Sequence, residues 1–321
     1  MFRFLAHRPR RAALLLALLF PLTLLAAPRP AKLTNGPVAL KTTDGVQLFA
    51  SVTGQGVPCV FVHGGPGAWS GMPEQLAGPL LNDRLQMIWL DQRGCGRSQN
   101  APRHDYSLAR LVQDLEDVRQ QLGLESWVLM AHSFGGTIAT EYAARHPERV
   151  RGLVLVECTL NLPASMQDMI QSGFDFVQVP DRTPYLDQGK PVQERFGLMV
   201  QHFNEHNVWR QLQYTTDAGF DSVSKADESN PHTGNEFGQY AMGISDYQRD
   251  FTALTPDIKA PVLVMTGKRD LCIGANHYKL FRFPRQQVAL MQTGHVPFVE
   301  EPEAFRQAVL TWLKKLPRRA A

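Results

Sequence analysis

Short apolar runs that alternate with amphipathic segments constrain the fold of this chain most strongly. Two runs of strand length end in glycine-rich loops, PCVFVHGGPG (58–67) and LQMIWLDQRGCGRS (85–98). Helical spacing follows in SLARLVQDLEDVRQQLG (107–123), where Ser107 is a candidate N-cap and Gly123 a stop signal. Because parallel strands need crossover connections, the pattern predicts an α/β fold with a mostly parallel central sheet flanked by helices.

The alternation is interrupted once, which predicts how the chain is divided. Residues 37–160 and 251–317 carry the alternating pattern and are predicted to form one α/β core, opened by a hairpin at Asp44-Gly45. Residues 161–250 are rich in Met, Gln and Phe and contain no clear buried strand. This segment has 13 acidic and 6 basic residues, a net charge of −7. We therefore predict a helical cap inserted into the core.

Residues 1–31 have the pattern of an export signal. Four arginines precede an apolar stretch (12–27) that contains Pro21 and ends in small residues. Residues 1–27 contain no acidic residue. The stretch is short for a membrane span. We expect a cleaved signal peptide or an uncleaved membrane anchor, with a misassigned start as a third reading. Either of the first two would place the protein in the periplasm or outside the cell, in the second case tethered to the membrane.

Composition limits the classes of function. A chain of 321 residues with 44% hydrophobic content can bury a sizeable core. Its formal charge of +3 falls to −1 without the four leader arginines, so we expect no nucleic-acid partner. The sequence implies no metal or organic cofactor and leaves the oligomeric state open. Spacing does not assign a disulfide among the four cysteines, Cys59, Cys95, Cys158 and Cys272.

The segment AHSFGG (131–136) places one serine between a strand-like run and a helix-like run. A nucleophile at such a tight turn needs small residues two positions before and after it, because the strand and helix approach closely there. Ala131 stands where the usual G-x-S-x-G pattern has glycine, and one methyl group is the smallest departure from it. We predict that Ser133 is a nucleophile, and the N-terminus of the following helix favours developing negative charge.

A serine nucleophile needs a base and an orienting acid. His295, in QTGHVPF, follows the last apolar run, and Asp270, in VLVMTGKRD, precedes it by 25 residues. The chain order Ser, acid, His is that of an α/β-hydrolase triad. Glu157, at the end of LVLVE, remains a competing acid because a neighbouring strand can also reach the histidine. His132 flanks the serine and is predicted to point away from the site.

The oxyanion formed on acyl attack needs preorganised N–H donors. One is predicted to come from Phe134, directly after the nucleophile, and the other from Gly64 or Gly65 in the HGGPG loop (63–67). Glycine there lets the backbone approach a substrate closely.

Four features together resemble the proline iminopeptidases and their relatives among the α/β-hydrolase serine peptidases. They are HGGPG (63–67), DQRGCGRS (91–98), the Ser133 turn and TGH (293–295). The resemblance covers about residues 38–315, although the insertion matches only in position. It implies an exopeptidase that acts on the N-terminus of its substrate, with catalytic roles falling on Ser133, Asp270 and His295.

The chain departs from that family in the residues expected to select the substrate. Ala131, His132 and Phe134 stand where the family usually has glycines and tryptophan, and no Trp-Glu pair aligns in the insertion, which has only Trp209. The negative cap would attract a cationic N-terminus.

Glu205 and Glu236 are candidates to hold a substrate amine. The substrate is expected to be a small molecule or short peptide. The DQRGCGRS loop is expected to be structural, with Asp91 and Arg93 bracing turns. Three functions remain open: an aminopeptidase, a carboxylesterase or lipase-like hydrolase of small esters or lactones, and a non-catalytic binding protein on the same fold.

Overall fold

An eight-stranded sheet forms the centre of the computed structural model, which describes residues 33–228 and 234–317. The predicted targeting segment 1–31 lies outside the described residues. The strand order is β1-β2-β4-β3-β6-β7-β9-β10. The strands are β1 Gly36–Lys41, β2 Gln47–Gly54, β3 Val57–Val62, β4 Leu85–Asp91, β6 Trp127–His132, β7 Val150–Val156, β9 Val262–Gly267 and β10 Gln286–Met291. Neighbours from β4 to β10 pair parallel, and β2 pairs antiparallel with both β1 and β4, which confirms the predicted α/β fold.

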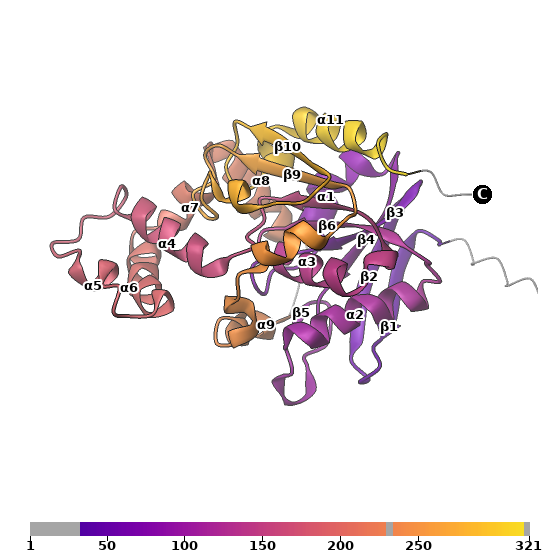
Figure 1. Ribbon diagram of the computed structural model, residues 1–321, viewed down its shortest axis with the longest axis horizontal. Helices are drawn as coiled ribbons and strands as arrows, with labels where there is room; N and C mark the ends of the chain where they lie inside the picture. Colours follow the sequence, from indigo (N-terminus) through magenta and orange to yellow (C-terminus); the bar gives the residue numbers. More distant parts are fainter. Residues whose placement is uncertain (1–32, 229–233, 318–321) are drawn as a thin grey trace, which may run out of the picture. The chain divides into compact units, whose positions relative to one another are not determined.

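Helices cover both faces of the sheet (Figure 1). In β3, Val60 and Val62 pack with α2 (Leu108–Gln121) and α3 (Gly135–Arg145). Cys59 and Phe61 of the same strand face the opposite core, formed with α1 (Gly71–Leu81), α10 (Pro297–Glu300) and α11 (Pro302–Leu313). Because both faces are covered, the central strands β3, β6 and β9 are apolar along most of their length.

Two local features follow the predictions from sequence. Residues 41 and 47 pair at the end of the β1–β2 hairpin, and Gly45 in its turn has φ +94°, a conformation that favours glycine. Ser107 caps α2 by accepting a hydrogen bond from the Arg110 N–H, and Gly123 follows the helix with φ +64°.

The segment between β7 and β9 is mostly helical. It contains α4 (Leu162–Gly173), α5 (Thr183–Leu186), α6 (Val192–Glu205), α7 (Val208–Gln213), α8 (Asp217–Glu228) and α9 (Glu236–Ala241). Figure 1 shows α4, α5 and α6 grouped together. The short 3₁₀ helices among the described residues are Pro102–His104, Pro147–Arg149, Ser245–Gln248, Phe251–Asp257 and His277–Leu280. No helix in the described part of the chain is long and apolar enough to cross a bilayer.

A two-residue strand in this segment was not predicted. β8 (Gly234–Asn235) pairs antiparallel with β5 (Cys95–Gly96) of the DQRGCGRS loop. The pairing fastens the start of α9 to the core.

Buried ion pairs hold the DQRGCGRS loop, as predicted. Asp91 accepts hydrogen bonds from the backbone N–H and guanidinium of Arg97. Arg93 is wholly buried and pairs with Asp114 at 2.6 Å and Asp44 at 2.9 Å. The predicted bracing by Asp91 and Arg93 is thus present, and removing either partner of a buried pair would leave an unpaired charge.

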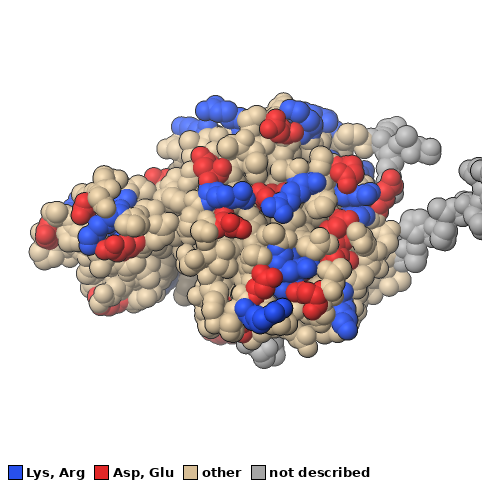
Figure 2. Space-filling model, turned by 60° about the horizontal axis from the view of Figure 1, so that its bottom comes forward, with Lys and Arg blue, Asp and Glu red and all other residues tan. Residues whose placement is uncertain are grey.

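The thiols are all inside the protein, and the surface charges are mixed. The four cysteines, which lie in the described residues, are buried and unpaired. Basic and acidic side chains are interspersed on the face shown in Figure 2. That face therefore offers no extended surface of one charge.

Candidate active site

Ser133 lies at the sharp turn between β6 and α3. Its φ of +55° is rare for a residue with a side chain, so the surrounding structure must hold it there. A Cβ atom on Gly135 would lie 2.2 Å from the Val62 carbonyl oxygen, and one on Gly136 would lie 2.4 Å from the Cβ of Cys158. The two glycines after the serine are therefore required by close packing of α3 on the strands.

His295 and Asp270 form a buried hydrogen-bonded pair. Nδ1 of His295 lies 2.8 Å from Oδ2 of Asp270, and both side chains are almost wholly buried. The other carboxylate oxygen accepts hydrogen bonds from the N–H groups of Cys272 and Ile273. Burial acts to raise the pKa of Asp270, but His295 and these hydrogen bonds outweigh it and lower the pKa below its usual range. The carboxylate is thus ionised and fixes the imidazole tautomer.

Ser133 and His295 line the same cavity. Among the hydrogen bonds of the described residues there is none between the Ser133 hydroxyl and His295. In hydrolases without substrate this contact is often long and tightens only in the complex. The structure thus brings the predicted acid and base into contact and places the predicted nucleophile beside them.

Glu157, the competing acid, lies beside Asp270. It directly follows β7, has φ +45° and is 2% exposed. Burial and the neighbouring Asp270 raise its pKa well above the usual range, which favours the protonated form and allows it to act as a donor toward Asp270. The carboxyl group that pairs with the His295 imidazole is therefore that of Asp270, and Glu157 contacts Asp270 rather than the imidazole.

His132 differs from its prediction. Its ring lies 4.7 Å from the ring of His295, centroid to centroid, and lines the cavity, so the expectation that it points away from the site is wrong. Nε2 donates to the backbone carbonyl of His295 at 2.8 Å. Burial and the nearby His295 lower the pKa of His132 to about 3, which keeps it a neutral donor.

The predicted oxyanion residues surround Ser133. A Cβ on Gly64 would lie 2.7 Å from the Ser133 Cβ and 3.0 Å from the Phe134 nitrogen, so the loop backbone touches the turn. Gly65 has φ +109°. Within residues 33–228 and 234–317, the N–H groups of Gly64, Gly65 and Phe134 have no hydrogen-bond acceptor. Free N–H groups beside the serine are what an oxyanion hole requires.

A cavity of ≈ 280 Å³ opens over these residues. The helices between β7 and β9 contribute mostly apolar side chains to it, including Leu162, Met169, Phe196 and Trp209. None of its lining residues, all in the described part of the chain, is Asp or Glu. The cavity is suited to a small, largely apolar substrate.

The helical segment also contacts the loops that carry the acid and the base. The N–H of His295 donates to the Gln213 carbonyl at 2.7 Å, and the N–H of Leu271 donates to the Leu212 carbonyl at 3.2 Å. The end of α7 therefore holds both loops. Nothing in the sequence indicates this, because backbone carbonyls make the contacts.

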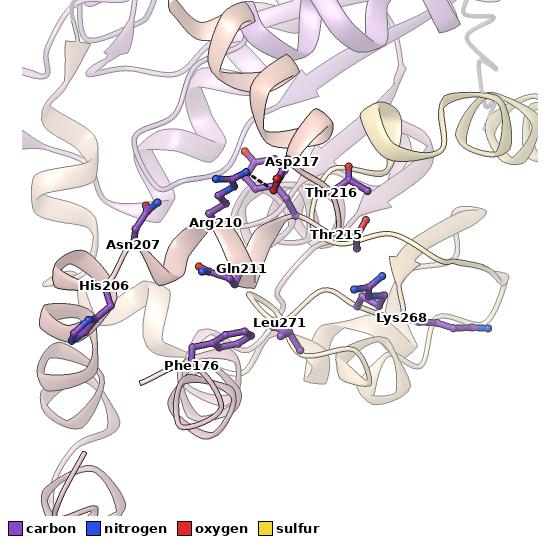
Figure 3. A pocket seen from close by; sticks show the side chains of 12 residues that line it. Phe176, His206, Asn207, Arg210, Gln211, Thr215, Thr216, Asp217, Lys268 and Leu271 are labelled. Atoms are coloured by element: carbon purple, nitrogen blue, oxygen red, sulfur yellow. Dashed lines mark ion pairs between the residues drawn. The ribbon is translucent and has the colours of Figure 1, made fainter. Parts of the chain in front are cut away.

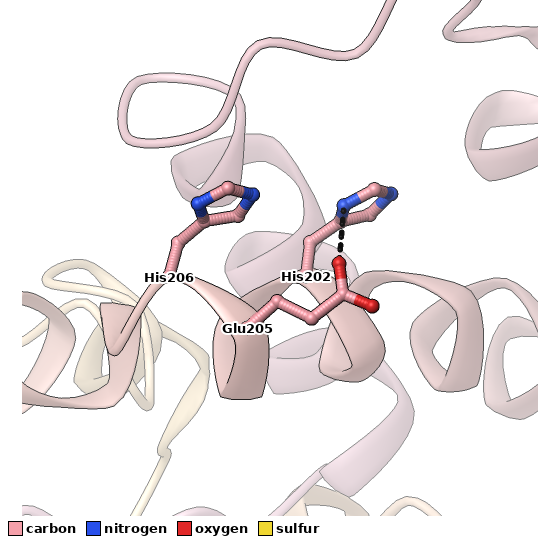
Figure 4. Close-up of side chains that lie close together, drawn as sticks. All are labelled: His202, Glu205 and His206. Carbon is pink, nitrogen blue, oxygen red and sulfur yellow. Dashed lines mark ion pairs between the residues drawn. The ribbon is translucent and has the colours of Figure 1, made fainter.

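Glu205 and Glu236, the predicted amine-binding residues, do not line the cavity. Glu205 ends α6, is about half exposed and lies near two histidines (Figure 4). Glu236 begins α9 and lies 2.5 Å from Nδ1 of His104. The structure therefore brings neither of them to Ser133.

Figure 3 shows a second cavity, of ≈ 650 Å³. Tyr214 lines both cavities. Lys268 and Arg269, the two residues before Asp270, line it from the loop after β9. Arg210 also lines it and forms an ion pair with Asp217. This cavity is more polar and contains none of the predicted catalytic residues.

Known proteins resemble this chain in sequence. A proline iminopeptidase from Neisseria gonorrhoeae is 40% identical over 142 residues, which cover 42% of this chain and 44% of that protein. A proline iminopeptidase from Clostridium botulinum is 26% identical over 305 residues, 88% of this chain and 99% of that protein. The predicted resemblance to proline iminopeptidases is confirmed, although the chain matches less than half the length of the first of these relatives.

The fold is matched as well. The solved structure of a proline iminopeptidase-related protein from Thermus thermophilus superposes with a TM-score of 0.75, at 21% identity over 88% of this chain and 98% of that one. At that identity the likeness shows the fold alone. The model of the alpha/beta hydrolase fold family matches residues 57–302. The chain therefore belongs to the alpha/beta hydrolase fold family.

Proposed function

We propose that this protein is a serine hydrolase that works through an acyl-enzyme, and that it is an aminopeptidase releasing N-terminal residues from short peptides. One observation carries the proposal. The buried Asp270–His295 pair opens on the same cavity as Ser133, which has the strained backbone of a nucleophile elbow.

The proposed reaction follows from that arrangement. His295, oriented by Asp270, takes the hydroxyl proton as Ser133 attacks the substrate carbonyl. The N–H groups of Gly65 and Phe134 stabilise the resulting oxyanion. His295 then gives the proton to the leaving group, and water attacks the acyl-enzyme with His295 again acting as the base.

Different observations support a peptide and an ester substrate. The named relatives and the net charge of −7 on residues 161–250 support an aminopeptidase with a cationic substrate terminus. A carboxylesterase of small esters or lactones is the second candidate. The cavity favours it because no carboxylate among the described lining residues is placed to pair with a substrate amine.

A substrate panel separates the two. The purified protein is assayed with proline p-nitroanilide, other aminoacyl arylamides and short p-nitrophenyl esters, with Ser133→Ala as the background control. Release of arylamine that depends on Ser133 supports the aminopeptidase. Ester cleavage with no arylamide cleavage would leave only the esterase, and no turnover of either class would contradict both.

We also propose that the protein is exported, either free or tethered by its N-terminus. The basic, apolar pattern of residues 1–31 supports this. Cell fractionation tests it, with the intact mass showing whether the leader remains. Recovery from the cytosol with an intact leader would contradict export.

A further inference from the structure

The end of α6 carries two histidines and a glutamate on one face, in the sequence HFNEH (202–206). We propose that this α6 cluster, His202, Glu205 and His206, binds a divalent transition metal ion of the Zn²⁺ type. One ligand atom from each of the three side chains lies within 4.8 Å of the other two. Figure 4 shows the three side chains projecting from the same side of the helix end.

Helical spacing accounts for this convergence. Residues three and four apart lie on the same face of a helix, one turn above another. Around tetrahedral Zn²⁺, ligand atoms are roughly 3.3 Å apart, so the cluster needs to close by no more than about 1.5 Å. His206 and Glu205 are exposed, so small changes of their side-chain torsions can bring the ligand atoms together.

Neighbouring residues already orient two of the ligands. Nε2 of His202 lies 2.7 Å from the Tyr185 hydroxyl, so when Nε2 carries the proton Nδ1 is left as the electron-pair donor. The Gln201 amide donates to Oε1 of Glu205 at 3.0 Å. The remaining atoms, Nδ1 of His202 and Oε2 of Glu205, face each other at 3.8 Å. A ligand held by a second hydrogen bond in this way is typical of metal sites.

The chemistry of the cluster selects the class of ion. Two imidazole nitrogens and one carboxylate oxygen suit Zn²⁺, Ni²⁺ or Cu²⁺, whereas Ca²⁺ and Mg²⁺ prefer oxygen ligands. The cluster lies at the C-terminal end of a 14-residue helix, where the helix dipole favours a cation. Water would complete the coordination.

The α6 cluster is separate from the proposed hydrolase site. None of its three residues lines the cavity that contains Ser133. Metal binding is therefore expected to leave hydrolysis of small substrates unchanged, and the proposal does not depend on the proposed function.

Titration of the untagged protein with Co²⁺, a coloured substitute for Zn²⁺, tests the site. We expect one saturable site with visible absorption bands, displaced by Zn²⁺. His206→Gln is expected to weaken Co²⁺ binding at least about tenfold, and Tyr185→Phe about tenfold, because each removes a ligand or its support. These side chains are partly or wholly exposed, so circular dichroism should be unchanged.

His104→Gln is the matched control. His104 is exposed and contacts Glu236, but no second histidine is within one helical turn of it. This variant should bind Co²⁺ as the wild type does. Equal binding by wild type and His206→Gln, or no saturable binding below about 1 mM Co²⁺, would overturn the proposal.

Discussion

The carboxyl edge of the central sheet and the helices of residues 162–241 contribute different kinds of side chain to the cavity. At the sheet edge, Asp270 is buried and contacts both His295 and Glu157. In the helices, Glu205 is about half exposed and lines no part of the cavity, while apolar side chains such as Phe196 face it.

This difference suggests that the sheet edge carries out the chemical step and that the helices bind the substrate. Buried polar groups depend on fixed partners, so a substitution at the sheet edge is expected to change the chemical step. Apolar lining contributes contact area to substrate and transition state alike, so a substitution in the helices is expected to change KM. The predictions below test this division, from the largest expected effect to the smallest.

Ser133→Ala removes the proposed nucleophile. We expect kcat to fall on the order of 10⁶-fold, with substrate binding retained, because the attacking oxygen is lost and the cavity is not. Steady-state kinetics and a binding measurement with the best substrate check this. Retention of more than a small fraction of kcat would show that another residue carries the chemistry.

Asp270→Asn removes the charge that orients His295. We expect kcat to fall about 10⁴-fold while the fold is retained, because the amide stabilises the wrong imidazole tautomer. Turnover measured beside Glu157→Gln provides the control. A larger loss of kcat for the Glu157 variant would reassign the acid to Glu157.

Trp209→Ala shortens the cavity wall contributed by α7. We expect kcat/KM to fall about tenfold, mainly through KM, because the indole supplies apolar contact area. Trp209→Phe should recover much of the loss. A fall confined to kcat would contradict the division between the two regions.

Glu157→Gln should change kcat by less than about threefold, because the amide N–H can replace the carboxyl O–H as a donor to Asp270.

The effect of Glu157→Gln on stability should depend on pH. The pKa of Glu157 is raised on folding, so its contribution to stability is full below its usual value of 4.5 and declines as pH rises above it. Urea unfolding at pH 4 and pH 8 should show the variant gaining in free energy of unfolding relative to wild type at the higher pH. If variant and wild type differ in free energy of unfolding by the same amount at pH 4 and pH 8, Glu157 ionises normally.

Much of the fold could be predicted because its signals are local. Apolar runs marked the buried strands, and the small residues around Ser133 marked the turn into α3. The loops of Asp270 and His295 could be located because each follows such a run.

What could not be predicted depends on strand order and register. Glu157 and Asp270 become neighbours because β7 pairs with β9 across a long insertion, which no local pattern indicates. His132 continues the alternation of β6 on the face of Val128 and Met130, where Phe298 and the His295 loop lie. β5 and β8 are two residues each, too short to show a period.

Labelling with a fluorophosphonate, followed by intact-mass and peptide mass spectrometry, tests the central claim most directly. The proposed triad predicts one adduct per chain on Ser133, formed at nearly the wild-type rate in Glu157→Gln and far more slowly in Asp270→Asn. An unlabelled protein, an adduct on another residue, or equal rates for the Asp270 variant and wild type would contradict it.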